Sequence, residues 1–308
     1  MGDMKAIVVE GYGDVGVLEL KQIPQPEPGE GEVLVRVHAV GVNAIDWKIR
    51  SGAMQRMMPV SFPWVPGVEL AGVVERVGPG VAGFSVGQEV FGRANAGAYA
   101  EYCVAPATTL APKPPSLTFV EAATIPIGAS TAWQALFDEG GLQPGQRVLI
   151  LGGSGGVGMF GVQFAHASGA QVLATTSTSN VEFVRSLGAD TVIDYTQTPA
   201  VPVEDVDLLF DAVGGATAAS AMAALKRGGR FVSIVNPPDG AQAESLGVKA
   251  SFFSMRASAE QLDTWSQMLE RGELRTLVGA VFPLSEAAQA HAQSQRGHGR
   301  GRIVLQVV

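Results

Sequence analysis

The residues best suited to bind a phosphate lie in the glycine-rich stretch ILGGSGGVGMFG, residues 150 to 161. Gly153, Gly155 and Gly158 fit the pattern Gly-x-Gly-x-x-Gly, in which glycines permit a tight turn and bring backbone N–H groups close to a pyrophosphate. The stretch follows a short apolar run and precedes a run with helical periodicity. A plain glycine-rich turn is the alternative, but the strand–loop–helix context favours a dinucleotide at the helix N-terminus.

The segment ATTSTSN, residues 174 to 180, indicates which dinucleotide binds. Enzymes that use NAD place an acidic side chain about 20 residues after the glycine loop, where it accepts hydrogen bonds from ribose hydroxyls. The segment contains no acid, and its hydroxyl side chains from Thr176 to Ser179 can donate to a 2′-phosphate. We therefore predict NADPH as the cofactor. The segment also has no Lys or Arg, and we expect Arg185 in the next helix to be solvated.

Strands and helices alternate around this loop from residue 117 to residue 256. Single helices between strands imply right-handed crossovers and a parallel sheet. Residues 1 to 116 instead hold short β-branched runs separated by Gly/Pro turns, which is typical of a small antiparallel barrel or sandwich. We predict an α/β fold with a Rossmann-type domain, residues 117–256, and a β-rich domain, residues 1–116. The terminal run GRIVLQVV has the texture of the β-rich domain, which we expect residues 257–308 to complete.

Composition excludes several classes of protein. The net charge of −8 opposes binding to nucleic acid or to an anionic membrane surface, and 46% hydrophobic residues with 16% charged ones indicate a compact globular chain. A single cysteine, Cys103, excludes an internal disulfide and a cysteine-rich metal site, and we expect it to be a small buried side chain. The four histidines show no metal-ligand spacing. No signal peptide or membrane span is visible, so we expect a cytoplasmic protein.

Several further stretches resemble the medium-chain dehydrogenase/reductase superfamily, and within it the zinc-independent, zeta-crystallin-like quinone oxidoreductases. They lie in order along nearly the whole chain: GVNAIDWKIRSG, PGVELAGVVERVGPGV, GAYAEYCV, TAWQALF, LGGSGGVG, SLGADTVIDY, FDAVGG and GHGRGRIVL. The resemblance implies a GroES-like β domain beside the Rossmann-type domain. It also implies a homodimer formed through the cofactor domain, with GRFVSIV and KASFFS as candidate edge strands.

The resemblance also shows where catalytic zinc would be bound. Zinc-dependent members use a cysteine where this chain has Asn43, and a histidine where it has Val68. A catalytic zinc needs at least three protein ligands, so we predict that no metal is bound. Hydride transfer without zinc favours acceptors that are already electron-poor. The expected function is an NADPH-dependent oxidoreductase acting on quinones or other α,β-unsaturated carbonyl compounds as small-molecule substrates.

Carried over residue by residue, the resemblance assigns Asn43, Asp46 and Trp47 to the substrate. It assigns a larger set to the cofactor: Ala44, Lys48, Thr131, Gln134, Gly153, Ser154, Gly155, Gly156, Val157, Thr176, Ser177, Tyr195, Val213, Gly214, Ile234, Phe252 and Phe253.

Some of these residues have other possible roles. Asp46 could instead cap the helix that follows Asn43, and Phe252 and Phe253 could be core or dimer contacts. Glu69 could pair with Lys48 or Arg50.

Two alternatives to quinone reduction stay open at this point. One is a 2-alkenal or enoyl reductase of the same fold, although no residue suited to be its general acid stands out. The other is a non-catalytic NADPH-binding redox sensor, which would bind the cofactor without oxidising it.

Overall fold

The computed structural model describes residues 2–198, 202–297 and 299–308. His298, one of the four histidines, lies outside the described residues. The chain divides into two compact units. Unit 1 comprises Met1–Ile127, Ala257–Gly272 and Thr276–Val308, and unit 2 comprises Gly128–Arg256 and Glu273–Arg275.

Unit 2 is built on a six-stranded sheet with the order β10-β9-β8-β11-β12-β13, in which every neighbouring pair is parallel. Numbered from β8, this is the 3-2-1-4-5-6 order of the dinucleotide-binding fold. The strands are β8 Arg147–Leu151, β9 Gln171–Thr176, β10 Thr191–Asp194, β11 Val206–Asp211, β12 Leu225–Ser233 and β13 Lys249–Phe252. The parallel sheet predicted from the strand–helix alternation is therefore confirmed.

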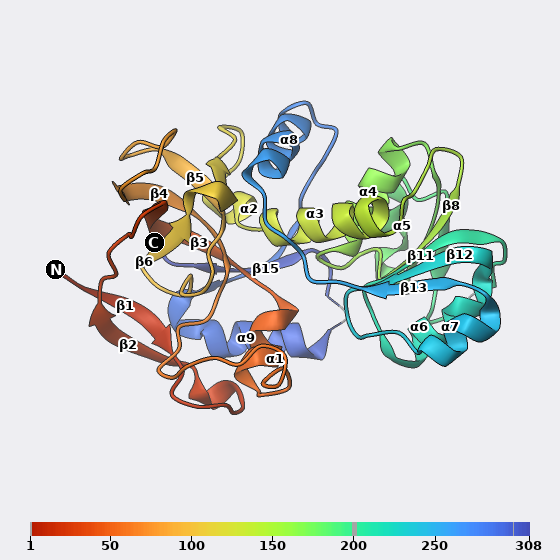
Figure 1. Ribbon diagram of the computed structural model, residues 1–308, viewed down its shortest axis with the longest axis horizontal. Helices are drawn as coiled ribbons and strands as arrows, with labels where there is room; N and C mark the ends of the chain where they lie inside the picture. Colours follow the sequence, from red (N-terminus) through yellow and green to blue (C-terminus); the bar gives the residue numbers. More distant parts are fainter. Residues whose placement is uncertain (1, 199–201, 298) are drawn as a thin grey trace. The chain divides into compact units, whose positions relative to one another are not determined.

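Helices cover both faces of this sheet, with α4 and α5 on one face and α6 and α7 on the other (Figure 1). Because both faces are covered, the central strands are continuously apolar: Val148 to Leu151 of β8 are fully buried. The helical segments are α3 Pro126–Trp133, the π-helix η3 Gln134–Glu139, α4 Gly158–Ala167, η4 Thr178–Asn180, α5 Val181–Ser186, α6 Gly215–Ala221, η5 Met222–Ala224 and α7 Gly240–Leu246.

Unit 1 contains a seven-stranded sheet with the order β14-β15-β3-β4-β5-β7, in which β6 also pairs with β3. All pairs are antiparallel except β14 with β15. The strands are β3 Glu32–Val42, β4 Glu69–Val77, β5 Glu89–Arg93, β6 Tyr102–Pro106, β7 Leu110–Pro112, β14 Val278–Pro283 and β15 Arg302–Gln306. A separate antiparallel pair is formed by β1 Asp3–Val8 and β2 Glu19–Pro24. The chain's last strand thus returns to β3, as its β-branched texture predicts.

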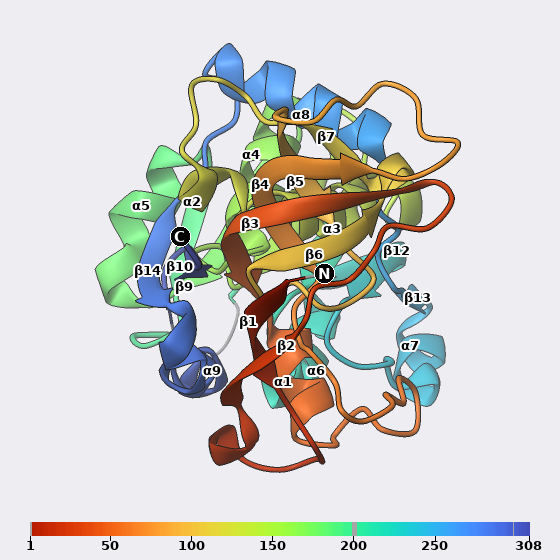
Figure 2. The ribbon, with the colours of Figure 1, turned by 90° about the vertical axis from the view of Figure 1, so that its left-hand side faces the viewer.

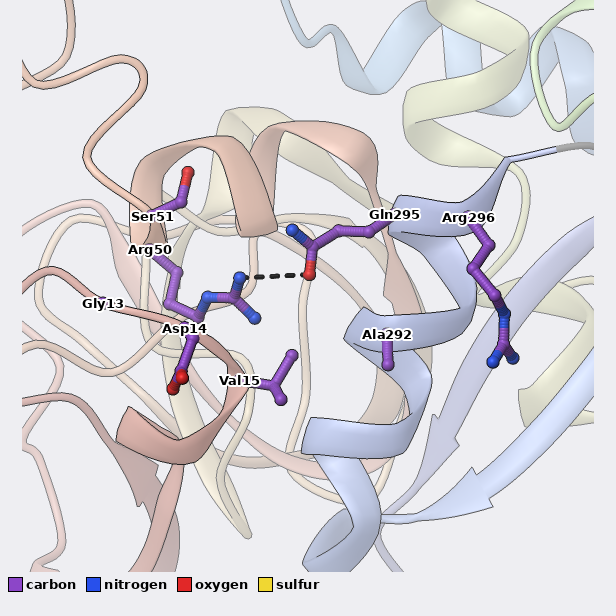
Figure 3. A pocket seen from close by; sticks show the side chains of 8 residues that line it. All are labelled: Gly13, Asp14, Val15, Arg50, Ser51, Ala292, Gln295 and Arg296. Carbon is purple, nitrogen blue, oxygen red and sulfur yellow. Dashed lines mark hydrogen bonds between the residues drawn. The ribbon is translucent and has the colours of Figure 1, made fainter.

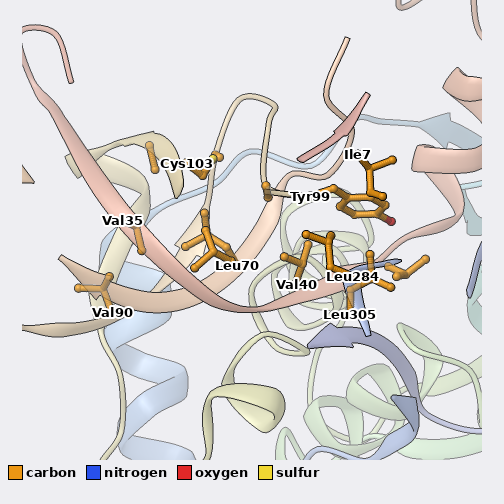
Figure 4. Packing of buried hydrophobic residues seen from close by; sticks show 14 of the residues in the cluster. Ile7, Val35, Val40, Leu70, Val90, Tyr99, Cys103, Leu284 and Leu305 are labelled. Atoms are coloured by element: carbon orange, nitrogen blue, oxygen red, sulfur yellow. The ribbon is translucent and has the colours of Figure 1, made fainter. Parts of the chain in front are cut away.

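The core of unit 1 lies against this curved sheet (Figures 2 and 4). Val40, Leu70, Val90, Tyr99 and Leu305 have no exposed surface, although they come from distant parts of the chain. The remaining elements are η1 Val15–Val17, α1 Ala44–Arg50, η2 Ala107–Thr109, α2 Phe119–Ala122, α8 Ala259–Glu270, η6 Leu284–Glu286 and α9 Ala287–Arg296. Cys103 belongs to this core with 2% of its surface exposed, as predicted for a small buried side chain.

Thr118 caps α2, which ends at Ala122, and the chain restarts as the helix α3 at Pro126. Proline has no N–H and fits the first turn of a helix, which explains the restart at that residue. The segment GRFVSIV was a candidate edge strand, but β12 lies between β11 and β13. Among the described residues, no helix is both long and apolar enough to cross a membrane.

Candidate active site

The residues assigned to the substrate lie at the start of α1 in unit 1. The Asp46 Oδ2 atom accepts a hydrogen bond from the Asn43 backbone N–H at 2.8 Å, so Asp46 does cap its own helix. Asn43 and Asp46 are buried, Trp47 and Lys48 are half-buried, and Ala44 is exposed. The Lys48 ammonium lies 5.9 Å from the centre of the Trp47 ring. The structure therefore brings these predicted residues together on one short helix.

A buried carboxylate, Glu69, is the centre of the polar cluster next to this helix. Its Oε1 atom accepts the Ile127 backbone N–H at 2.7 Å, and its Oε2 atom accepts the Asn43 amide at 2.9 Å. Arg302 forms an ion pair with the same Oε2 atom and donates to the Asn43 Oδ1 atom at 2.9 Å. Glu69 is fully buried and Arg302 is 5% exposed, so this is an internal ion pair whose acceptors are filled.

The expectation that Glu69 pairs with Lys48 or Arg50 is wrong. Arg302 begins β15, whose next residue, Ile303, pairs with Val42 of β3, and this register sets the guanidinium beside Asn43. A guanidinium placed there is also unsuited to share the position with a divalent cation. The donor set at Asn43 and Glu69 therefore does not fit zinc, and no group of three metal-ligating side chains is present in the described part of the chain.

A second set of buried groups extends from Asp46 to α9. The Tyr99 hydroxyl donates to the Asp46 Oδ2 atom at 3.1 Å and lies 3.0 Å from the His291 Nε2 atom. Burial raises the pKa of Asp46 to about 7, against the opposing hydrogen bonds from Asn43 and Tyr99. Burial also lowers the pKa of His291 to about 3, with a further contribution from Arg50. His291 is thus neutral, and Asp46 can carry a proton near neutral pH.

Sequence reasoning did not identify Arg302 or His291 as members of these clusters. Arg302 stands 233 residues beyond Glu69, and only the register of β15 against β3 shows that the two side chains meet. The one available signal was a charged residue opening a strand that is otherwise apolar.

The predicted phosphate loop lies between β8 and α4 in unit 2. A Cβ atom added to Gly158 would lie 2.1 Å from the Gly152 carbonyl oxygen, and one added to Gly153 would lie 2.9 Å from the Ala174 Cβ atom. Gly152 has a φ of +79°, which side chains rarely adopt. Gly155, Gly156 and Val157 complete the loop and are partly exposed. The loop therefore leaves its backbone unobstructed at the start of α4, as pyrophosphate binding requires.

The ends of β9 and β10 lie beside this loop. Thr176 donates to the Ser154 hydroxyl at 2.9 Å, which links two residues predicted to bind the cofactor. Asp194 at the end of β10 accepts the Thr178 hydroxyl at 2.6 Å and the Thr196 hydroxyl at 2.7 Å, and these bonds lower its pKa. Asp194 is opposite Thr176 in the parallel register. A carboxylate therefore does stand near the predicted ribose position, although it comes from the next strand.

Asp194 could have been found from the sequence. It ends the strand that follows β9, and the carboxyl ends of neighbouring parallel strands meet at one edge of a sheet. Arg185 instead pairs with Glu182 on the exposed side of α5, as expected for a solvated residue.

The remaining predicted cofactor residues have varied surroundings. Asp211 accepts the N–H groups of Val213 at 2.9 Å and Gly214 at 2.7 Å, so it braces this turn. Gln134 is engaged with the backbone of Arg256 through two hydrogen bonds, at 2.7 and 3.0 Å. Thr131 is buried, Ser177, Ile234, Phe252 and Phe253 are half-buried, and Tyr195 and Val213 are exposed. Their cofactor contacts stay predictions.

Replacing Arg302 with Met should leave the Glu69 carboxylate buried without its counter-charge. We expect the free energy of unfolding at pH 8 to fall by about 3–5 kcal/mol, measured by urea denaturation. Because burial raises the pKa of Glu69, the loss should shrink as the pH falls and the carboxyl becomes protonated. The double variant with Glu69→Gln and Arg302→Met should recover at least half of the loss. An equal loss in the single and double variants would contradict this account.

The buried Asp46 carboxyl should make a contribution to the free energy of unfolding that falls as the pH rises. Its pKa is 3.8 when unperturbed and about 7 in the fold, so the native state holds the proton more tightly than the unfolded chain. Its contribution is fully present below about pH 4 and is lost as the pH rises toward 7. Relative to the native chain, Asp46→Asn should gain up to about 4 kcal/mol across this range. Chemical denaturation at several pH values checks this. Asp194→Asn, at a half-buried carboxyl whose pKa is lowered instead, should show no such gain.

Replacing Gly158 with Ala should block the phosphate loop, because the new methyl group would meet the Gly152 carbonyl. We expect the dissociation constant for NADPH, measured by fluorescence quenching, to rise by at least about tenfold. Gly240→Ala is the matched control, because its Cβ would have nothing within 4 Å. Unchanged cofactor binding in a folded Gly158→Ala protein would rule out this loop as the pyrophosphate site.

Comparisons with known proteins agree with this geometry. Residues 29–115 match the alcohol dehydrogenase GroES-like domain, and residues 187–305 match a family described as zinc-binding dehydrogenase. The chain is 33% identical to a chloroplastic quinone oxidoreductase of Triphysaria versicolor over 98% of both chains. It superimposes on the quinone oxidoreductase of Coxiella burnetii with a TM-score of 0.91, 32% identity and full coverage of both chains. A mycobacterial protein complexed with NADPH gives a TM-score of 0.86 and 32% identity over 99% of this chain and 100% of that one. The chain therefore belongs to the medium-chain dehydrogenase/reductase superfamily, among its quinone oxidoreductases, and is an oxidoreductase of an NAD(P)H-binding family.

Proposed function

We propose that this protein is a zinc-free, NADPH-dependent reductase of quinones and related α,β-unsaturated carbonyl compounds. The observation that carries the proposal is the ion pair of Arg302 with Glu69, bonded on both sides to Asn43. These side chains stand where the resemblance places the metal of zinc-dependent relatives, and both carboxylate oxygens and the amide oxygen already accept hydrogen bonds. A reductase built this way needs an acceptor that stabilises the incoming charge itself, and a conjugated carbonyl does so by delocalisation.

NADPH, when bound, supplies the hydride, and the chain's own residues position and shield it. The glycine loop and the N-terminus of α4 would hold its pyrophosphate, and Thr176, whose hydroxyl donates to Ser154, would stand beside the adenosine ribose. The Asn43 amide cannot rotate freely, because both of its ends are hydrogen-bonded. It therefore presents a fixed polar edge at the start of α1. Asp46 can hold a proton near neutral pH at the Oδ1 atom, since its Oδ2 atom accepts from Asn43 and Tyr99.

The choice between NADPH and NADH depends on two opposing features. The absence of an acid in residues 174–180 supports NADPH, and a related mycobacterial protein is known in complex with it. The half-buried Asp194 carboxylate, fixed by two threonine hydroxyls, would repel a 2′-phosphate. We therefore propose a preference for NADPH that Asp194 keeps modest.

The test is to measure NADPH and NADH oxidation with benzoquinones, naphthoquinones, phenanthrenequinone, 2-alkenals and crotonyl thioesters. We expect NADPH to support faster turnover with quinones than with the other acceptors. Asp194→Asn should lower the KM for NADPH by severalfold and change the KM for NADH by less than about twofold, because only NADPH carries the 2′-phosphate. The control is Glu204→Gln, which removes an exposed charge before β11, at the opposite edge of the sheet.

Other outcomes separate the alternatives. Faster turnover with 2-alkenals or thioesters would identify an enoyl-type reductase, and NADPH binding without oxidation would identify a redox sensor. A tenfold preference for NADH would overturn the cofactor assignment. Turnover confined to ordinary alcohols would overturn the zinc-free mechanism.

A further inference from the structure

A pocket of about 660 Å³ lies in unit 1, at the opposite end of α1 from Asn43. Its walls come from three segments: the turn before η1, the last turn of α1 and the last turns of α9 (Figure 3). The residues that line it are Gly13, Asp14, Val15, Arg50, Ser51, Ala292, Gln295 and Arg296. None of them belongs to the predicted substrate or cofactor sites.

Arg50 forms the floor of this pocket and is only 1% exposed. One of its terminal nitrogens, Nη2, donates to the Gln295 Oε1 atom at 3.1 Å. The Nε and Nη1 atoms are buried and have no hydrogen-bond partner. Nε carries one hydrogen and Nη1 carries two, so three N–H donors of a buried cation are unfilled. No ion pair of Arg50 within 4.0 Å is present among the described residues, although the negative charge of Asp14 in the same pocket acts on the guanidinium and opposes the lowering of its pKa by burial.

A buried cation whose N–H groups lack hydrogen-bond acceptors destabilises the folded state. Any buried donor without a partner does so, and a charged donor does so more strongly than a neutral one. The other buried arginine of this unit, Arg302, differs from Arg50, because its guanidinium pairs with a carboxylate and donates to an amide oxygen. We propose that the pocket is a binding site for a small organic oxyanion, a phosphate ester or a carboxylate, whose oxygens take the place of this missing acceptor on Arg50.

The rest of the lining fits such a ligand. Arg296 adds a second positive charge at the exposed end of α9, whereas Asp14 supplies one negative charge and is bonded to the Gly16 N–H at 2.8 Å. Val15 and Ala292 offer apolar surface to the body of the ligand. Gln295 is exposed and lies beside the guanidinium, whose Nη2 atom donates to it, so the Nε and Nη1 atoms are the ones left for a ligand (Figure 3).

The test uses the full chain saturated with NADP⁺, so that added phosphate cannot bind at the glycine loop. Inorganic phosphate, glycerol phosphate and acetate are each titrated by calorimetry and thermal unfolding, against chloride at matched ionic strength. We expect one saturable site with a dissociation constant of about 1 mM or below. Tighter binding of glycerol phosphate would identify a phosphate-ester site, and tighter binding of acetate a carboxylate site.

Four variants test whether the anion binds in this pocket. Arg50→Met should weaken the binding at least tenfold. Ala292→Phe should do the same by filling the pocket without changing its charge, and it is informative if the Arg50 variant fails to fold. Asp14→Asn should tighten binding severalfold by removing the repelling charge. Arg56→Met removes an exposed arginine outside the pocket and should have no effect. The absence of saturable binding, or equal binding in Ala292→Phe and the native chain, would overturn the proposal.

Discussion

The buried carboxylate of Glu69 is the constraint on which the architecture of unit 1 depends. A carboxylate with no exposed surface is tolerated only if hydrogen-bond donors surround it. Its donors here come from three distant places: Asn43 before α1, Ile127 in the first turn of α3, and Arg302 at the start of β15. Gly41 reinforces the arrangement, because a Cβ there would lie 2.3 Å from the Glu69 Oε2 atom. Solvating one charge thus fixes the relative positions of four chain segments.

In unit 2 the topology of the parallel sheet, and not a side-chain pair, brings the functional groups together. The glycine loop follows β8, Thr176 ends β9, Asp194 ends β10 and Asp211 ends β11. All are therefore at the carboxyl edge of the sheet, where the order reverses between β8 and β11. Glycine is required at Gly158 because the helix must start against the loop's own carbonyl. The site in this unit is mainly a consequence of topology, whereas that in unit 1 is a consequence of side-chain pairing.

This difference explains how much the sequence could predict. The parallel sheet, the glycine loop, the brace at Asp211 and the return of the last strand to β3 all follow from local periodicity and turn residues. The partner of Glu69 does not, because lysine and arginine residues nearer in sequence look equally suitable until the β3–β15 register is known. Asp194 was missed for a related reason: the expected acid was sought on β9, whereas side chains of β10 reach the same edge.

The two buried arginines of unit 1 differ in the acceptors that surround their guanidinium groups. Arg302 is 5% exposed and Arg50 is 1% exposed, so both have lost nearly all hydration. Arg302 has a carboxylate and an amide oxygen as acceptors, and of its nitrogens only Nε is buried without a partner. Arg50 has one acceptor, the neutral amide oxygen of the exposed Gln295, and its Nε and Nη1 atoms are buried without partners, although the charge of Asp14 acts on it. The two cations are similarly buried but differ in the negative charge that contacts them directly. A ligand that brings negative charge to Arg50 would give it the kind of partner that Arg302 already has within the fold.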